Sequence, residues 1–87
     1  MRNLIEKIRN LATDSGLDTY DLLQVYKYLF YGFPRRSGTQ ILLDSPQSDL
    51  AQAVRVLTMK ECKEENEIWD TWEFMLKETE NKTIKWD

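Results

Sequence analysis

The stretch from Gln47 to Glu80 contains neither glycine nor proline, and this constrains the fold more than any other feature of the chain. Glycine and proline interrupt helices most strongly, so a long run without them predicts helical structure. The whole chain of 87 residues has only three glycines and two prolines, which argues against a turn-rich sandwich or barrel. We therefore predict an all-α fold, a small bundle of three to four helices forming a single domain over residues 1–87.

Apolar spacing and turn residues mark the first two helices. Apolar side chains recur on one helical face near the N-terminus, at Leu4, Ile5, Ile8, Leu11 and Ala12. Gly16 suits the left-handed position that follows the end of such a helix. The next helix is expected to run from a cap at Asp18 or Thr19 to Tyr31, with Gly32 ending it.

The C-terminal half is predicted to begin a helix with Ser45 as its N-cap and Pro46 as its first residue. The apolar residues that follow stay in phase on a helical wheel, at Leu50, Val54, Leu57, Ile68, Trp72 and Met75. One continuous helix over residues 47–80 would be about 50 Å long. A compact chain of this length has a radius of gyration of only about 12 Å, so a straight helix would overhang its own core.

Three glutamates interrupt this apolar face, at Glu61, Glu64 and Glu65. We therefore favour two helices, with a break within residues 60–66, Asn66 as the new N-cap and Asn81 as the end. Two short segments outside the helices have strand character, residues 40–43 and residues 83–86. At most one short β pairing, between these two segments, is expected.

The side chains most used in catalysis and in zinc binding are missing or single. The chain has no histidine and one cysteine, Cys62, so a histidine base, a disulfide within the chain and a zinc site in the monomer are all excluded. It also lacks a glycine-rich phosphate loop and the spacing of a calcium-binding loop. We predict a protein that is not an enzyme and that uses no cofactor and no metal ion.

Charge is unevenly distributed along the chain, whose formal net charge is -3. Residues 1–40 carry six Lys/Arg and four Asp/Glu, whereas residues 41–87 carry six and eleven. An acidic half is repelled by nucleic-acid phosphates. It favours either a basic protein partner or simple solubility.

Neither export nor membrane insertion is predicted. The N-terminal segment is charged throughout and lacks the apolar core of a signal peptide. No apolar run approaches the roughly 18 residues that span a bilayer. We expect a cytoplasmic protein that has no membrane partner.

Residues 8–27 resemble a helix-turn-helix, with a small residue at Ala12 and a glycine at the turn. Two packed helices joined by a glycine turn give the same pattern. In the DNA-binding interpretation, the contacting residues would be Thr19, Tyr20, Gln24, Arg35 and Arg36. Asp18 and Asp21 lie at the N-terminal end of the would-be recognition helix, where carboxylates oppose phosphate contact.

Three tyrosines, Tyr20, Tyr28 and Tyr31, share one face of the second predicted helix. This face lies opposite the predicted core residues of that helix, which are Leu22, Tyr26, Leu29 and Phe30. A helix that is aromatic or apolar on two faces is either sandwiched between other helices or carries an interaction surface. Both interpretations remain open at this point.

Trp69 and Trp72 form a second aromatic pair, surrounded by acidic residues that include Glu65, Asp70 and Glu73. Tryptophans at this spacing are typical of a helical core. In so small a chain, however, three tryptophans, four tyrosines and three phenylalanines are difficult to bury completely. Aromatic side chains edged by carboxylates would suit contact with a basic protein surface.

The loop of residues 37–46, with a helix after it, is similar to the loop and helix of DNase-colicin immunity proteins. Those proteins carry Tyr-Tyr-Pro within the loop, whereas this chain has Ile41, Leu42 and Leu43. The residues essential to that family are therefore absent, and its function is not carried over.

These observations favour a small acidic protein that binds another protein and blocks or regulates it by occupying a surface, as inhibitors, immunity proteins and phage-encoded regulators do. The expected partner is a protein with a basic surface, and a homodimer is an alternative. A second hypothesis is a DNA-binding helix-turn-helix regulator that dimerises through its C-terminal half. The acidic recognition end makes nucleic acid the less favoured partner.

Overall fold

The computed structural model describes residues 2–31 and 44–83 and contains four helices. These are α1 (Arg2–Ser15), α2 (Thr19–Tyr31), α3 (Pro46–Glu61) and α4 (Glu65–Thr83). No strand occurs in this part of the chain, so the prediction of a small all-α bundle is confirmed. The β pairing expected between residues 40–43 and 83–86 falls on segments outside the described residues, apart from Thr83, which ends α4.

The turn between α1 and α2 forms where its sequence predicts. Gly16 has a φ of 75°, the left-handed conformation that favours glycine, and its N–H donates to the carbonyl of Thr13 over 3.2 Å. Asp18 then caps α2, because its Oδ1 accepts a hydrogen bond of 2.8 Å from the N–H of Asp21. The side chain of Asp18, rather than that of Thr19, is therefore the cap.

The start of α3 also follows its sequence signal. Ser45 is the N-cap, and its Oγ accepts a hydrogen bond of 3.2 Å from the N–H of Ser48. Pro46 is the first residue of the helix, where its missing N–H costs nothing. The extended backbone of Cys62, with φ -99° and ψ 132°, ends α3. The preference for two helices over one is thus confirmed, with the break inside residues 60–66.

Two finer expectations about α4 are wrong. The helix begins at Glu65, so Asn66 lies inside its first turn and is not the N-cap. Glu67 explains the difference, since its Oε1 accepts the N–H of Lys63 over 3.3 Å and stabilises an earlier start. Asn81 does not end the helix either, because α4 continues to Thr83.

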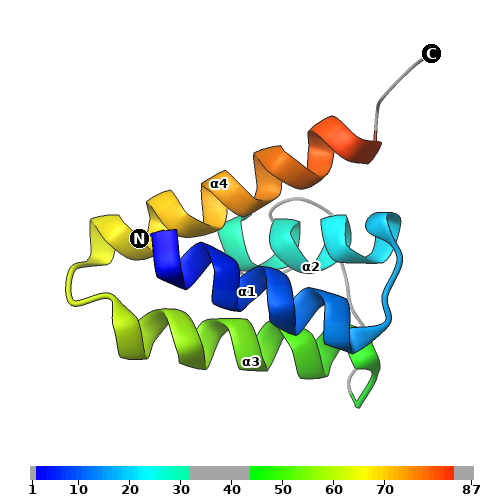
Figure 1. Cartoon of the computed structure of the whole chain (residues 1–87), viewed down its shortest axis with the longest axis horizontal. Helices are drawn as coiled ribbons and strands as arrows, with labels where there is room; N and C mark the ends of the chain where they lie inside the picture. The colour runs from blue at the N-terminus through cyan, green and yellow to red at the C-terminus, as the bar shows by residue number, and fades with distance from the viewer. Residues whose placement is uncertain (1, 32–43, 84–87) are drawn as a thin grey trace.

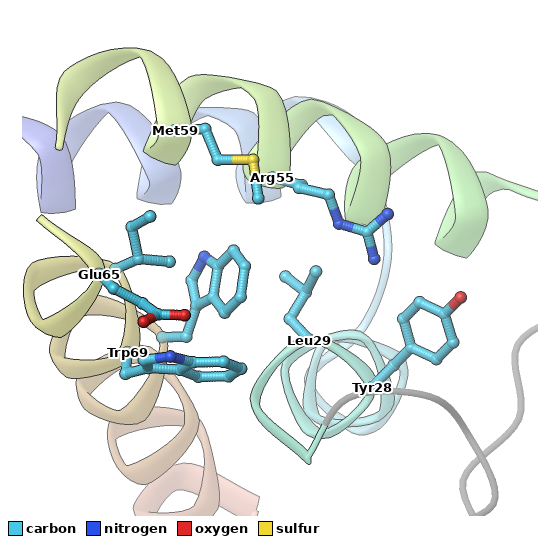
Figure 2. Close-up of a pocket in the computed structure, with 8 residues that line it drawn as sticks. Tyr28, Leu29, Arg55, Met59, Glu65 and Trp69 are labelled. Carbon is cyan, nitrogen blue, oxygen red and sulfur yellow. The ribbon is translucent and has the colours of Figure 1, made fainter. Parts of the chain in front are cut away.

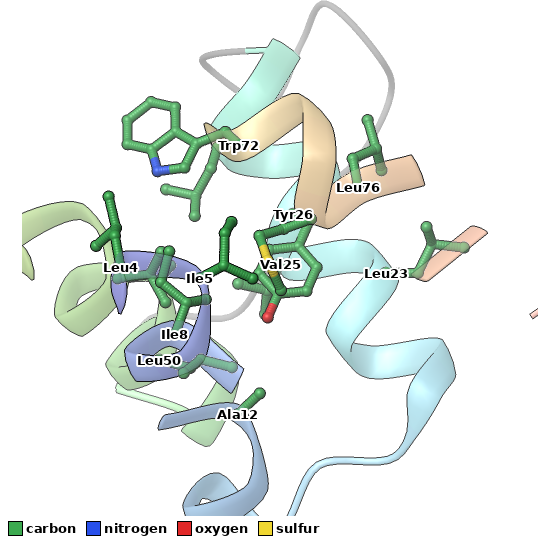
Figure 3. Close-up of a cluster of buried hydrophobic side chains, with 14 residues drawn as sticks. Leu4, Ile5, Ile8, Ala12, Leu23, Val25, Tyr26, Leu50, Trp72 and Leu76 are labelled. Carbon is green, nitrogen blue, oxygen red and sulfur yellow. The ribbon is translucent and has the colours of Figure 1, made fainter. Parts of the chain in front are cut away.

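All four helices contribute to one hydrophobic core (Figure 3). The buried apolar residues are Leu4, Ile5, Ile8, Ala12, Leu23, Val25, Tyr26, Leu29, Leu50, Ala51, Val54, Trp72, Met75 and Leu76. The predicted apolar face of α1 is largely confirmed, with Leu11 partly buried at its edge. The buried arc of α2 is wider than expected, because Leu23 and Val25 are buried as well as Tyr26 and Leu29. The other two predicted core residues of this helix, Leu22 and Phe30, are only partly buried.

The wider arc follows from the position of α2 in the bundle. The chain reverses after α3, and α4 returns to pack chiefly on α2, while α2 also packs on α3 and α1 packs on α3 (Figure 1). α1 and α4 make little direct contact, and they are joined across their gap by the ion pair between Arg9 and Glu78. None of the four helices is both long and apolar enough to cross a bilayer.

Candidate functional site

An apolar groove opens where α2, α3 and α4 meet, and we refer to it as the aromatic groove (Figure 2). Its volume is about 220 Å³. Its lining residues come from all three helices: Tyr28, Leu29, Arg55, Met59, Glu65, Ile68, Trp69 and Trp72. Four of the residues predicted to bind a partner, Tyr28, Glu65, Trp69 and Trp72, therefore lie together.

Two tryptophans on successive turns of α4 form one side of the aromatic groove. Their rings are perpendicular, with an interplanar angle of 90° and centroids 5.4 Å apart. Trp72 is only 4% exposed and belongs to the core, whereas Trp69 is 38% exposed. The spacing of the two tryptophans was compatible with core packing and with partner contact, and each residue takes one of these roles. Trp72 packs in the core behind the groove wall, and Trp69 presents its ring to solvent.

The orientation of Trp72 is held by a buried hydrogen bond between helices. Its indole N–H donates to Oγ1 of Thr58 over 3.1 Å, and this hydroxyl donates to the carbonyl of Val54 over 2.6 Å. Both groups are therefore satisfied without water. Because Trp69 packs edge-on against Trp72, the wall of the aromatic groove is positioned by the core.

Further aromatic rings extend this wall from α4 onto α2. Phe30 packs against Trp69 with centroids 6.1 Å apart, and Tyr31 packs against Phe30 at 5.1 Å, both with edge-to-face geometry. Tyr31, at the end of α2, is exposed. A connected row of four rings thus runs from the buried Trp72 to the surface.

Opposite charges stand at two sides of the aromatic groove. Glu65 extends from the first turn of α4 beside the tryptophans, while the guanidinium of Arg55 reaches from α3 toward Tyr28 and Leu29 (Figure 2). No ion pair joins either group to another residue of the described segments. The aromatic groove therefore combines an apolar floor with an anionic side and a cationic side.

The remaining residues predicted to bind a partner lie outside the aromatic groove. Tyr20 is 62% exposed in the first turn of α2. Asp70 is exposed on α4, and Glu73 forms a 3.3 Å ion pair with Lys77 one turn further along. The tyrosine face is accordingly neither fully covered nor fully open, since Tyr20 and Tyr31 at its ends are exposed and Tyr28 is partly buried.

Only some residues of the DNA-binding interpretation lie in the described part of the chain. Thr19 and Gln24 are partly buried on α2, and Arg35 and Arg36 lie outside the described residues. The N-terminal end of α2 is occupied by interactions within the chain, because Asp21 Oδ1 accepts a 3.1 Å hydrogen bond from the Gln47 amide. Over residues 2–31 and 44–83, no group of three or more acidic, cysteine or histidine side chains is placed to hold a metal ion.

Two residues that line the aromatic groove were not identified from the sequence. Arg55 and Met59, one turn apart on α3, line the aromatic groove. Their involvement depends on how α3 and α4 are placed around α2, and no local pattern signals it.

Comparisons with protein families, with characterised proteins and with solved structures give no match for this chain.

Proposed function

We propose that this chain is a small regulatory protein that binds another protein through the aromatic groove and blocks the surface it covers. The observation that carries the proposal is the exposed ring of Trp69, which is held against the core and flanked by Glu65. Tryptophan, tyrosine and arginine dominate the binding energy of protein interfaces. All three residue types line this groove, as Trp69, Tyr28 and Arg55.

The size of the aromatic groove favours a protein side chain over a metabolite. At about 220 Å³ it is smaller than the roughly 300–1,000 Å³ of ordinary small-molecule sites. Exposed side chains with apolar surface continue around it, at Tyr31 and Met59. Such a surface suits one apolar anchor residue of a partner inserted in the groove, with flatter contacts around it.

The charges define the chemistry of that partner. Glu65 favours a basic group close to the tryptophan side of the groove. A cation placed there would also meet the face of Trp69, where cation–π attraction adds to the ion pair. Arg55 favours an acidic or hydrogen-bond-accepting group on the opposite side. The partner segment is accordingly an apolar anchor preceded or followed by a lysine or arginine, on a mainly basic surface.

Regulation through DNA binding has less support. Carboxylates of Asp18 and Asp21 stand at the N-terminal end of α2, where a recognition helix would approach phosphates. Of the three residues on α2 that were expected to contact DNA, Thr19 and Gln24 are partly buried and only Tyr20 is exposed.

The proposal is tested by affinity capture from a lysate of the source cells, with nuclease added. The tagged wild-type chain should recover a stoichiometric protein, and Trp69→Ala and Glu65→Lys should each lose most of it. Val56→Ser is the control, because Val56 is also an exposed apolar residue but lies on the α1–α3 side. Circular dichroism of each variant must first show a folded chain.

Two results would overturn the proposal. One is recovery that disappears on nuclease treatment, which would promote the DNA-binding alternative. The other is equal recovery by the wild type, Trp69→Ala and Glu65→Lys, which would place the partner elsewhere on the surface.

A further inference from the structure

A second cavity, lined by none of the residues of the aromatic groove, lies where α1, α2 and α4 meet. Its volume is about 290 Å³. Apolar side chains form part of its wall, namely Ala12, Leu17, Leu22 and Met75. Polar groups form the rest, including Arg9, Tyr26, Glu78, Thr79 and Lys82. We refer to it as the tyrosine cavity.

The hydroxyl group of Tyr26 is the unusual feature of this cavity. The side chain is 1% exposed, and its oxygen makes no hydrogen bond with any described residue. Figure 3 shows the hydroxyl directed toward α1, on the side of Ala12, which also lines the cavity. Buried polar groups almost always have a hydrogen-bond partner, and a buried phenol that lacks one destabilises the fold.

The phenol is a hydrogen-bond donor at physiological pH. Burial, together with the nearby carboxylate of Glu78, raises the pKa of Tyr26 to about 12. The proton therefore stays on the oxygen. A molecule that satisfies this group must offer an acceptor atom.

The charges around the tyrosine cavity exclude an ionic ligand on the phenol. Arg9 is already neutralised, because it donates to Glu78 over 2.5 and 3.3 Å and to Glu6 over 2.7 Å. An anion on Tyr26 would face the carboxylate of Glu78. A cation has no lone pair with which to accept the phenol proton, and it would also meet Lys82 in the same wall. An uncharged acceptor is the chemistry that remains.

We propose that the tyrosine cavity binds a small uncharged molecule that has an apolar body and one hydrogen-bond acceptor, such as a ketone or an ester. The acceptor takes the proton of the Tyr26 hydroxyl. The apolar body lies against Leu22 and Met75. The cavity is close to the lower limit of small-molecule sites, which suits a ligand no larger than a single substituted ring.

The test uses two probes of nearly equal shape, acetophenone, which has a carbonyl acceptor, and cumene, which has none. Their affinities are measured by ¹⁵N chemical-shift titration of the wild type, of Tyr26→Phe and of Tyr20→Phe. Tyr26→Phe should weaken acetophenone by roughly 2-fold to 10-fold, as expected for one hydrogen bond, and should leave cumene unchanged. Tyr20→Phe, which loses an exposed hydroxyl on the same helix, should change neither affinity.

A second readout needs no variant. Acetophenone bound to the wild type should show nuclear Overhauser contacts with the methyl groups of Ala12 and Met75. Failure of acetophenone to bind, binding without these contacts, or a Tyr26→Phe variant that affects both probes equally would overturn the proposal. A water molecule would then be the natural partner of the phenol.

Discussion

The hydroxyl group of Thr58 connects two helices through a single oxygen atom. It accepts the indole N–H of Trp72 from α4 and donates to the carbonyl of Val54 within α3. Thr58 and Trp72 are both buried, so neither group can turn to water instead. The position of the tryptophan wall, and with it the aromatic groove, therefore depends on one threonine far from the surface.

Thr58→Val should lower the free energy of unfolding by about 1–3 kcal/mol, because it leaves the buried indole N–H without an acceptor. Thr71→Val is the matched control. Thr71 is equally buried, but its hydroxyl only bonds the carbonyl of Glu67 in its own helix. Urea denaturation measures both variants. Equal losses would show that the link between the helices adds nothing to stability.

Trp69 and Trp72 lie on the same helix but differ in their structural roles. Trp72→Ala should lower the free energy of unfolding by about 3–5 kcal/mol, the range for a large aromatic side chain lost from a core. Trp69→Ala should cost clearly less, since much of its ring is already in contact with solvent. Thermal and urea unfolding of the two variants would check the assignment. A larger loss for Trp69 would mean that it supports the core.

At the scale of the helices, the starts of α2, α3 and α4 each have an identifiable cause in a side chain. Asp18→Ala should destabilise the protein by about 0.5–2 kcal/mol, because the first turn of α2 loses the acceptor for the N–H of Asp21. Asp14→Ala serves as its control. Asp14 is exposed near the C-terminal end of α1, where a negative charge is unfavourable, so its removal should be neutral or stabilising. The comparison is made by urea denaturation.

The link between α1 and α4 should make stability depend on acid. The hydrogen bond from Arg9, reinforced by its charge, lowers the pKa of Glu78 below its usual 4.5. A lowered carboxyl pKa stabilises the fold above the unfolded-state value. That contribution is lost as the pH falls through the lower, folded-state value.

The free energy of unfolding should therefore fall on acidification below about pH 4.5. Arg9→Gln should flatten this dependence. Lys77→Gln, which breaks an exposed pair within α4, should leave the profile nearly unchanged. Urea denaturation at a series of pH values provides the test, and an unaltered acid limb in Arg9→Gln would contradict it. Some loss of stability in acid should remain in Arg9→Gln, because Lys7 also lowers the pKa of Glu61.

Local residue patterns were sufficient to predict the helices but not which helices pack against one another. The caps at Asp18 and Ser45 and the glycine turn depend on residues a few positions apart, so they are readable along the chain. The start of α4 was misplaced because a side chain at Glu67 outweighs the capping preference of Asn66. Arg55 and Met59 could not be assigned, since their place in the aromatic groove requires knowing that α4 folds back onto α2.

At the scale of the whole molecule, α2 separates two unlike hollows. The aromatic groove lies on the side toward α3 and α4, and the tyrosine cavity lies between α2, α1 and α4. α4 contributes to both, through Trp69 near its beginning and Glu78 near its end. Because α4 lines both cavities, the effect of a substitution on α4 should be measured on both of them as well as on stability.

The unequal burial of Trp69 and Trp72 also has an optical consequence. A dissolved quencher such as acrylamide can collide with the indole of Trp69 but not with that of Trp72, because only the first ring reaches solvent. A partner seated on the aromatic groove would shield the first ring and leave the second as it was. With the third tryptophan, Trp86, replaced by phenylalanine, the chain carries its own fluorescent reporter of occupancy, which needs no attached dye.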